Sequence, residues 1–186
     1  MSILLDAGPI LNFVAVSEQG LLLGLAEAHD LSLAAPEKVR EEVDRKAATG
    51  RFARTGALST WRKLVAAGRV GILDDTLTDE FVAAVVRVSG QQATDRVRSS
   101  KDLGELMVIA HASVLSQQGT DVFVLIDEGD GRKRALREKE WLATAGAAGT
   151  LTLWNTPQVL KQTAPERWKS IYTRMRDFDD GLAPLC

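Results

Sequence analysis

Two acidic residues each follow a short apolar run, at positions where a β-strand would end. Asp6 comes directly after the apolar residues 3–5, and Asp127 comes directly after the apolar residues 122–126. If the two runs are parallel neighbouring strands, both carboxylates lie at the same edge of the sheet. Carboxylate oxygens suit Mg²⁺ or Mn²⁺, which take few protein ligands and keep several waters. The pair therefore predicts a divalent-metal site.

Two further acids stand at helical spacing. Glu42 lies beside Val39 and Val43, which are one turn apart and face the core of an expected helix. Asp102 and Glu105 share one side of another expected helix, so both can reach the sheet edge from its first turn. We take Asp6, Glu42, Glu105 and Asp127 as candidate catalytic residues and metal ligands, with Asp102 and Asp130 as secondary candidates.

Each acid also has a purely structural interpretation. Asp6 and Asp102 would each be favourable as the N-cap of the helix that follows. For Asp102, we favour the N-cap interpretation over a role as metal ligand. Asp127 begins an Asp-Glu-Gly-Asp-Gly stretch that would form a turn in any case. Glu42 and Glu105 would be ordinary on the solvated face of a helix.

The elements expected to position these residues alternate between strand and helix. Pattern and turn residues predict strands near 3–5, 31–35, 70–73, 121–126 and 149–153, and helices near 10–14, 20–29, 39–43, 55–87, 102–118, 132–144 and from 156 onwards. Residues 89–100, rich in Gln, Arg and Ser, have no apolar period and are expected to form a loop facing the site. Such alternation predicts an α/β protein with a mostly parallel sheet covered on both faces.

Composition limits the class of protein. The 186 residues fit one domain, and 45% hydrophobic and 26% charged residues are typical of globular chains. A net charge of −2 excludes a strongly basic nucleic-acid-binding coat. The single cysteine, Cys186, forms no internal disulfide, and neither a signal peptide nor a membrane-spanning run is present. We therefore expect a soluble, cytoplasmic protein.

The acidic motifs, taken in order, resemble the PIN domain. They are Ile-Leu-Leu-Asp6-Ala-Gly-Pro, Val39-x-x-Glu42-Val43, Asp102-Leu-Gly-Glu105 and Leu-Ile-Asp127-Glu-Gly-Asp-Gly-Arg132. The resemblance covers roughly residues 1–160, with 161–186 as a helical extension of the same domain, and it is strongest for VapC-like toxins. It implies a three-layer α/β/α fold and a Mg²⁺- or Mn²⁺-dependent endoribonuclease in which the four acids hold the metal. It also implies an RNA substrate, an antitoxin partner and a homodimer.

The chain departs from the common toxin pattern at two positions. Gly8 stands where Ser or Thr is frequent, which removes a hydroxyl near the ligands, and the third acid is Glu105 rather than Asp. Both departures bear on activity rather than on fold. They keep open a PIN-like scaffold that binds RNA or protein without cutting. A receiver-type phosphoacceptor domain ranks lower, because Asp6 lacks a neighbouring acid and no Lys follows the last strand.

A basic run follows Asp127 on an expected helix. Arg132, Lys133 and Arg134 are candidate RNA-binding residues, since cations beside an acidic site can position backbone phosphates. The alternative is a solvated helix surface. Asn12, one turn into the first helix, is either a supporting group of the site or an ordinary helix residue.

Overall fold

The computed structural model describes residues 1–99, 101–127 and 129–185, and Ser100, Glu128 and Cys186 lie outside this description. Its centre is a five-stranded sheet in the order β3-β2-β1-β4-β5, in which every neighbouring pair is parallel. The strands are β1 (Ser2–Leu5), β2 (Ser32–Pro36), β3 (Gly71–Leu73), β4 (Val122–Leu125) and β5 (Leu151–Trp154). The predicted parallel α/β sheet is therefore confirmed.

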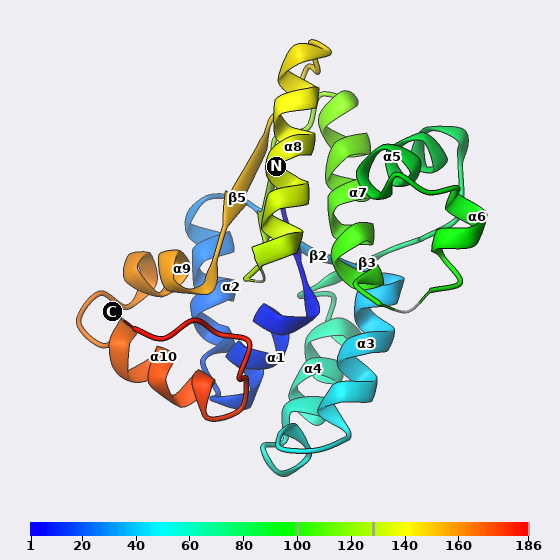
Figure 1. The fold of residues 1–186 in the computed structure, drawn as a ribbon. Helices are drawn as coiled ribbons and strands as arrows, with labels where there is room; N and C mark the ends of the chain where they lie inside the picture. The colour runs from blue at the N-terminus through cyan, green and yellow to red at the C-terminus, as the bar shows by residue number, and fades with distance from the viewer. Residues whose placement is uncertain (100, 128, 186) are drawn as a thin grey trace.

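Helices fill the connections between the strands (Figure 1). They are α1 (Ala7–Ala15), α2 (Gln19–Ala28), α3 (Glu37–Ala47), α4 (Ala57–Ala66), α5 (Asp79–Ser89), α6 (Ala93–Arg96), α7 (Leu103–Gln117), α8 (Gly129–Thr144), α9 (Thr156–Thr163) and α10 (Trp168–Arg176), with a 3₁₀ turn at Phe52–Arg54. The chain passes from β1 to β2 through α1 and α2, and from β4 to β5 through α8. Because these crossovers run in opposite directions and are right-handed, they cover opposite faces of the sheet. The result is a three-layer α/β/α arrangement.

Helix α7 is the central helix of one face. It packs against the strands β1, β2, β4 and β5, lies between α8 and α5 (Figure 1), and also contacts α3. Its residues Val108, Ile109 and Ala110 are fully buried, although the helix has little amphipathic character. Apolar residues are spread around α7 instead of along one face, as expected for a helix that is covered by other elements on most of its surface.

Two apolar clusters stabilise the layers. The larger one joins the fully buried Ile3, Leu4 and Val124 of the central strands to the helices on both faces. A smaller one, which includes Phe81, lies between α5 and α7. The α5–α6 segment is thus attached to the outer side of α7 by its own small core.

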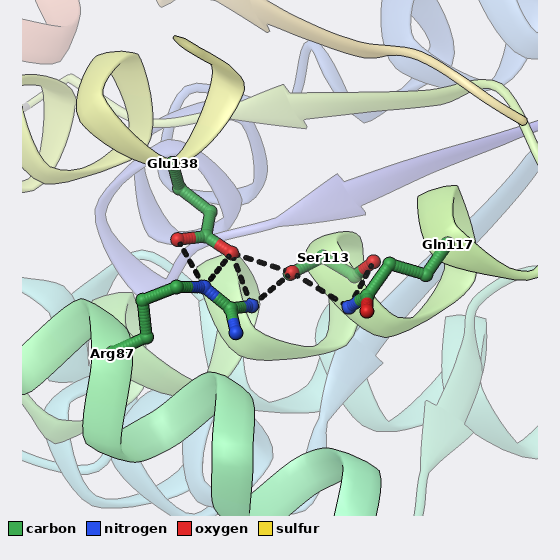
Figure 2. A network of polar contacts seen from close by, with 4 residues as sticks. All are labelled: Arg87, Ser113, Gln117 and Glu138. Atoms are coloured by element: carbon green, nitrogen blue, oxygen red, sulfur yellow. Dashed lines mark hydrogen bonds and ion pairs between the residues drawn. The ribbon is translucent and has the colours of Figure 1, made fainter. Parts of the chain in front are cut away.

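A buried polar network adds to that attachment (Figure 2). Glu138 of α8 is only 3% exposed and forms an ion pair with Arg87 of α5, at 2.6 Å. Ser113 of α7 donates a hydrogen bond to Glu138 Oε1 and accepts one from Arg87 Nη2, while Gln117 donates to Ser113. Arg87 also lies 3.5 Å above the ring of Trp141. Three helices are joined by groups whose charges compensate one another in the interior.

The local predictions agree with the structure except at a few boundaries. The expected loop at 89–100 contains the short helix α6, and its last residue, Ser100, lies outside the described residues. The helix expected from about 132 begins at Gly129. The expected end of the main domain at residue 160 falls inside α9. The segment beyond residue 160 continues the fold, since α10 packs on α9 and α1.

Candidate functional site

The ends of β1 and β4 meet at the centre of the sheet. Leu5 pairs with Leu125, and the backbone N–H of Asp6 donates to the carbonyl of Leu125 at 3.2 Å. Asp127 follows two residues after Leu125, so both acids lie just beyond the same edge, as expected. Crossovers leave β1 and β4 in opposite directions, which makes this edge the position where open α/β sheets commonly bind ligands.

Asp6 is a strongly perturbed acid at this edge. Its side chain is buried, and burial, together with the nearby carboxylates of Glu42 and Asp127, raises its pKa from 3.8 to about 7. The backbone N–H of Ala7 and the ammonium group of Lys46 act in the opposite direction. Asp6, Glu42 and Asp127 are therefore close enough to interact electrostatically.

Asp127 is held in place by the start of α9. Its two carboxylate oxygens accept hydrogen bonds from the Thr156 backbone N–H at 2.7 Å and the Thr156 hydroxyl at 2.6 Å. Burial raises the pKa of Asp127, and the two bonds from Thr156 only partly offset that rise. Asp127 is thus a part-buried carboxylate whose orientation is fixed by Thr156.

Glu42 reaches Asp6 past a glycine at the start of α7. A Cβ built at Gly104 would lie 2.7 Å from Glu42 Oε2 and 3.6 Å from Asp6 Oδ1. The carboxylates of Glu42 and Asp6 therefore converge on the space that a side chain at position 104 would fill. Glu42 also forms an ion pair with Lys46, one turn later on α3, at 2.6 Å. Lys46 supplies positive charge to the acidic cluster.

Glu105 enters from the same helix end but faces α8. It is 6% exposed, and a Cβ built at Gly131 would overlap its carboxyl group, with Oε1 2.8 Å away. Arg134 of α8 lies 3.8 Å from Glu105 Oε2. The alternative interpretation of Glu105 as a residue on a solvated helix face is thus wrong, because the residue is buried between two helices at a point where α8 needs a glycine.

The secondary acidic candidates have other partners. Asp102 occupies the N-cap position of α7, as expected, but with a left-handed φ of 52° and no capping hydrogen bond from its side chain. It forms an ion pair with Arg134 at 3.3 Å. Asp130 is exposed and pairs with Lys133 at 3.0 Å.

The three candidate RNA-binding cations have different environments. Arg132 donates from one guanidinium nitrogen to the carbonyls of Ile126 and Trp154, at 3.0 and 2.9 Å, and so binds the ends of β4 and β5 together. Lys133 is exposed, whereas Arg134 lies between Asp102 and Glu105. The basic run is thus neither one uniform RNA surface nor one uniform solvated face.

Sequence reasoning missed some residues of this edge. Asp179, in the segment after α10, accepts a hydrogen bond from Asn12 Nδ2 at 2.8 Å and contributes to the raised pKa of Asp127. Nothing in the local sequence around residue 179 signals this long-range approach. The role of Lys46 did have a signal, because it stands four residues after Glu42 on one helix face.

Carboxylate oxygens are a suitable donor set for Mg²⁺ or Mn²⁺, and the approach of Asp6 and Glu42 over Gly104 provides a cradle that a Cβ would fill. In the described parts of the chain, however, no group of three or more His, Cys, Asp or Glu side chains is arranged to hold a metal ion. Two of the four candidates already have strong partners, Lys46 for Glu42 and Thr156 for Asp127. Carboxylate chemistry thus suits a divalent cation, but the described side chains do not form a set of three ligands around one point.

Comparison with known proteins adds no family. No family model, no curated protein and no solved structure matches the chain. Within the described residues, no single helix is both long and apolar enough to cross a membrane; α1 and α2 reach that length only as a pair bent by 115°.

Proposed function

We propose that this protein is a metal-dependent endoribonuclease whose site is the acidic edge formed by Asp6, Glu42, Glu105 and Asp127. One observation carries the proposal: Asp6 and Asp127 follow adjacent parallel strands at the reversal point of the sheet, and Glu42 converges on Asp6 over Gly104. Asp6 is a buried carboxylate whose pKa is raised by burial and by the charges of Glu42 and Asp127, and such a group is typical of sites built to receive a cation or a proton.

The residues divide the work according to their environments. Asp6 and Asp127 are the central ligands of the proposed Mg²⁺ or Mn²⁺, and Thr156 fixes the orientation of Asp127. Glu42 adds its carboxylate from α3, and Glu105, which packs against α8, would support the site from α7. When bound, such a cation supplies a more acidic water and neutralises charge on a phosphodiester. Gly104 keeps the space between Asp6 and Glu42 open.

The test is cleavage of mixed RNA by the purified protein. We expect the wild type to cut in Mn²⁺ or Mg²⁺ and to stop in chelator, and Asp6→Asn to be inactive while still folded. Asp30→Asn is the matched control, because Asp30 is an exposed turn residue with a left-handed φ of 52° that Asn tolerates. Cleavage by Asp6→Asn at the wild-type rate would refute the site.

A scaffold that binds RNA or protein without cutting is the second candidate. It is favoured by the ion pair between Lys46 and Glu42, which places a built-in cation at the acidic cluster. In the same assay, a wild type that binds RNA but leaves it intact with either metal would establish this alternative.

The toxin role, an antitoxin partner and a homodimer rest on the PIN resemblance alone. If they hold, expression of the wild type stops growth of a bacterial host, whereas Asp6→Asn does not. Light scattering of the purified protein would then give twice the mass of 20.2 kDa.

A further inference from the structure

A basic pocket shares the start of α7 with the acidic edge, since Asp102 and Leu106 line it while Gly104 faces Asp6 and Glu42. It has a volume of 250 Å³ and is bounded by the end of α5, by α6, by the start of α7 and by α8. Its polar lining includes Ser89, Arg96, Ser99, Lys101, Asp102 and Arg134. Three cationic side chains and one carboxylate therefore line it, a formal charge of +2.

Arg96 forms the inner wall of this pocket. It is 7% exposed, which is unusual for arginine, and it donates hydrogen bonds to the carbonyls of Ser99 at 2.9 Å and Lys101 at 2.6 Å. The two bonds hold the carbonyls of Ser99 and Lys101 beside the guanidinium group. A guanidinium carries five N–H donors in a planar fork that matches phosphate oxygens.

Arg134 approaches Arg96 from α8. Arg96 and Arg134 line the same pocket, and burial and the positive charge of Arg134 both lower the pKa of Arg96. Asp102 is the carboxylate that Arg134 meets in this pocket, at 3.3 Å, and Glu105 lies 3.8 Å from Arg134 on the other side. Even if Glu105 is counted, the charge around the pocket stays positive at +1. An anion bound between Arg96 and Arg134 would offset the repulsion between their positive charges.

We propose that this pocket binds a backbone phosphate of the RNA strand, next to the group that the acidic edge would cut. The inference rests on the proposed function and specifies how that site takes its substrate. Arg134 and the start of α7 connect the two places, since Arg134 contacts Asp102 in the pocket and also Glu105, whose neighbour Gly104 faces Asp6 and Glu42. Lys101 is exposed at the pocket mouth, where it can meet an entering strand. An acidic protein thereby gains a local anion site for a polyanionic substrate.

The test measures binding apart from cutting. Fluorescence anisotropy with a fluorescein-labelled single-stranded RNA is recorded in chelator, with Asp6→Asn as the parent so that cleavage cannot occur. Lys101→Gln and Arg134→Gln are added to that parent, and Lys139→Gln is the control, because Lys139 is exposed on α8 and does not line the pocket. Melting curves verify that each variant is folded.

We expect Lys101→Gln and Arg134→Gln each to weaken RNA binding about 5- to 10-fold, as for the loss of one hydrogen bond of ordinary strength. Each should also reduce the slope of log affinity against log salt by about 0.7. Lys139→Gln should change both quantities little. Arg96→Lys keeps the positive charge but loses the planar fork, so it should weaken RNA binding. It also serves as the test of this position if Arg96→Gln does not fold.

Several outcomes separate this inference from the nuclease proposal. Pocket-dependent binding of RNA that the wild type never cuts supports the pocket and removes the nuclease. Binding that is unchanged in Lys101→Gln and Arg134→Gln overturns the pocket, whether or not RNA is cut. A parent that binds no RNA overturns it too. The proposal is also overturned if inorganic phosphate raises the melting temperature of the parent but not of its Arg134→Gln variant, while RNA does not bind. The ligand of the pocket would then be a free anion.

Discussion

Gly104 brings the backbone of α7 against the carboxyl group of Glu42, because a Cβ at position 104 would lie 2.7 Å from Glu42 Oε2. The same Cβ would lie 3.4 Å from Val39 Cγ2 and 3.6 Å from Asp6 Oδ1. Position 104 therefore controls how closely Glu42 and Asp6 approach. A glycine here is required by side-chain space, since no left-handed φ demands it.

Gly104→Ala should separate activity from stability. The methyl group displaces the flexible end of Glu42, so we expect RNA cleavage to fall at least about tenfold, the effect of losing roughly 1.4 kcal/mol of transition-state stabilisation. Stability should change by less than about 1 kcal/mol, because the better helix propensity of Ala offsets the contact. Gly24→Ala in α2 is the control: nothing lies within 4 Å of its Cβ, so it should leave cleavage unchanged. Equal cleavage by Gly104→Ala and wild type would contradict the role of Glu42.

The raised pKa of Asp6 predicts a pH dependence of stability. The pKa of Asp6 is about 7 in the folded protein, whereas the ordinary value of 3.8 applies to the unfolded chain. The folded protein therefore binds the proton more tightly than the unfolded chain. Stability is therefore higher at low pH and falls as the pH rises toward 7, by roughly 3 kcal/mol between pH 5 and pH 8. Asp127, whose pKa is also raised, contributes with the same sign.

Urea unfolding in chelator at pH 5 and pH 8 measures this effect. Asp6→Asn removes the titrating group, so the variant should be more stable than the wild type at pH 8 and should show a smaller loss between the two pH values. Asp30→Asn should follow the wild type. Identical pH profiles for wild type and Asp6→Asn would mean that Asp6 is not strained at neutral pH.

Divalent metal should stabilise the wild type. At ten times its dissociation constant, Mg²⁺ or Mn²⁺ adds about 1.4 kcal/mol by mass action, which raises the melting temperature of a chain of this length by roughly 3–6 °C. Asp6→Asn removes one ligand and one repelling charge, so its metal-free melting temperature should be higher and its metal-induced rise smaller. A wild type whose melting does not respond to metal would remove the metal site.

The network of Figure 2 predicts a large stability effect away from the acidic edge. Arg87→Met leaves the buried Glu138 carboxylate without its cation, so we expect a loss of roughly 3 kcal/mol in urea unfolding. The double variant Arg87→Met, Glu138→Leu should lose less, because the buried charge has gone with its partner. The exposed pair of Arg69 and Glu27 is the control, and Arg69→Met should cost under about 1 kcal/mol. A similar cost for Arg87→Met and Arg69→Met would contradict a buried ion pair.

Most of the sheet could be predicted from short segments. The apolar runs before Asp6 and Asp127 are nearly continuous, as in strands covered on both faces, and the ends of such runs place the acids. The start of helix α9 could also be predicted, since Pro157 stands in its first turn and Asn155 and Gln158 have the spacing of the capping box that they form. By contrast, α6 has only four residues and no apolar period, so the pattern of residues 89–100 did not reveal it.

By itself, the sequence determined the parallel α/β class and the position of two acids at strand ends, because strand ends and crossovers follow local pattern. Only the tertiary structure decided which groups those acids meet. Glu105 is buried because Gly131 of another helix leaves room for it, and Asp179 reaches Asn12 from 167 residues away. Arg96 meets Arg134 in the same way, across two helices. Such encounters depend on how whole elements pack, and no periodicity within a single element records them.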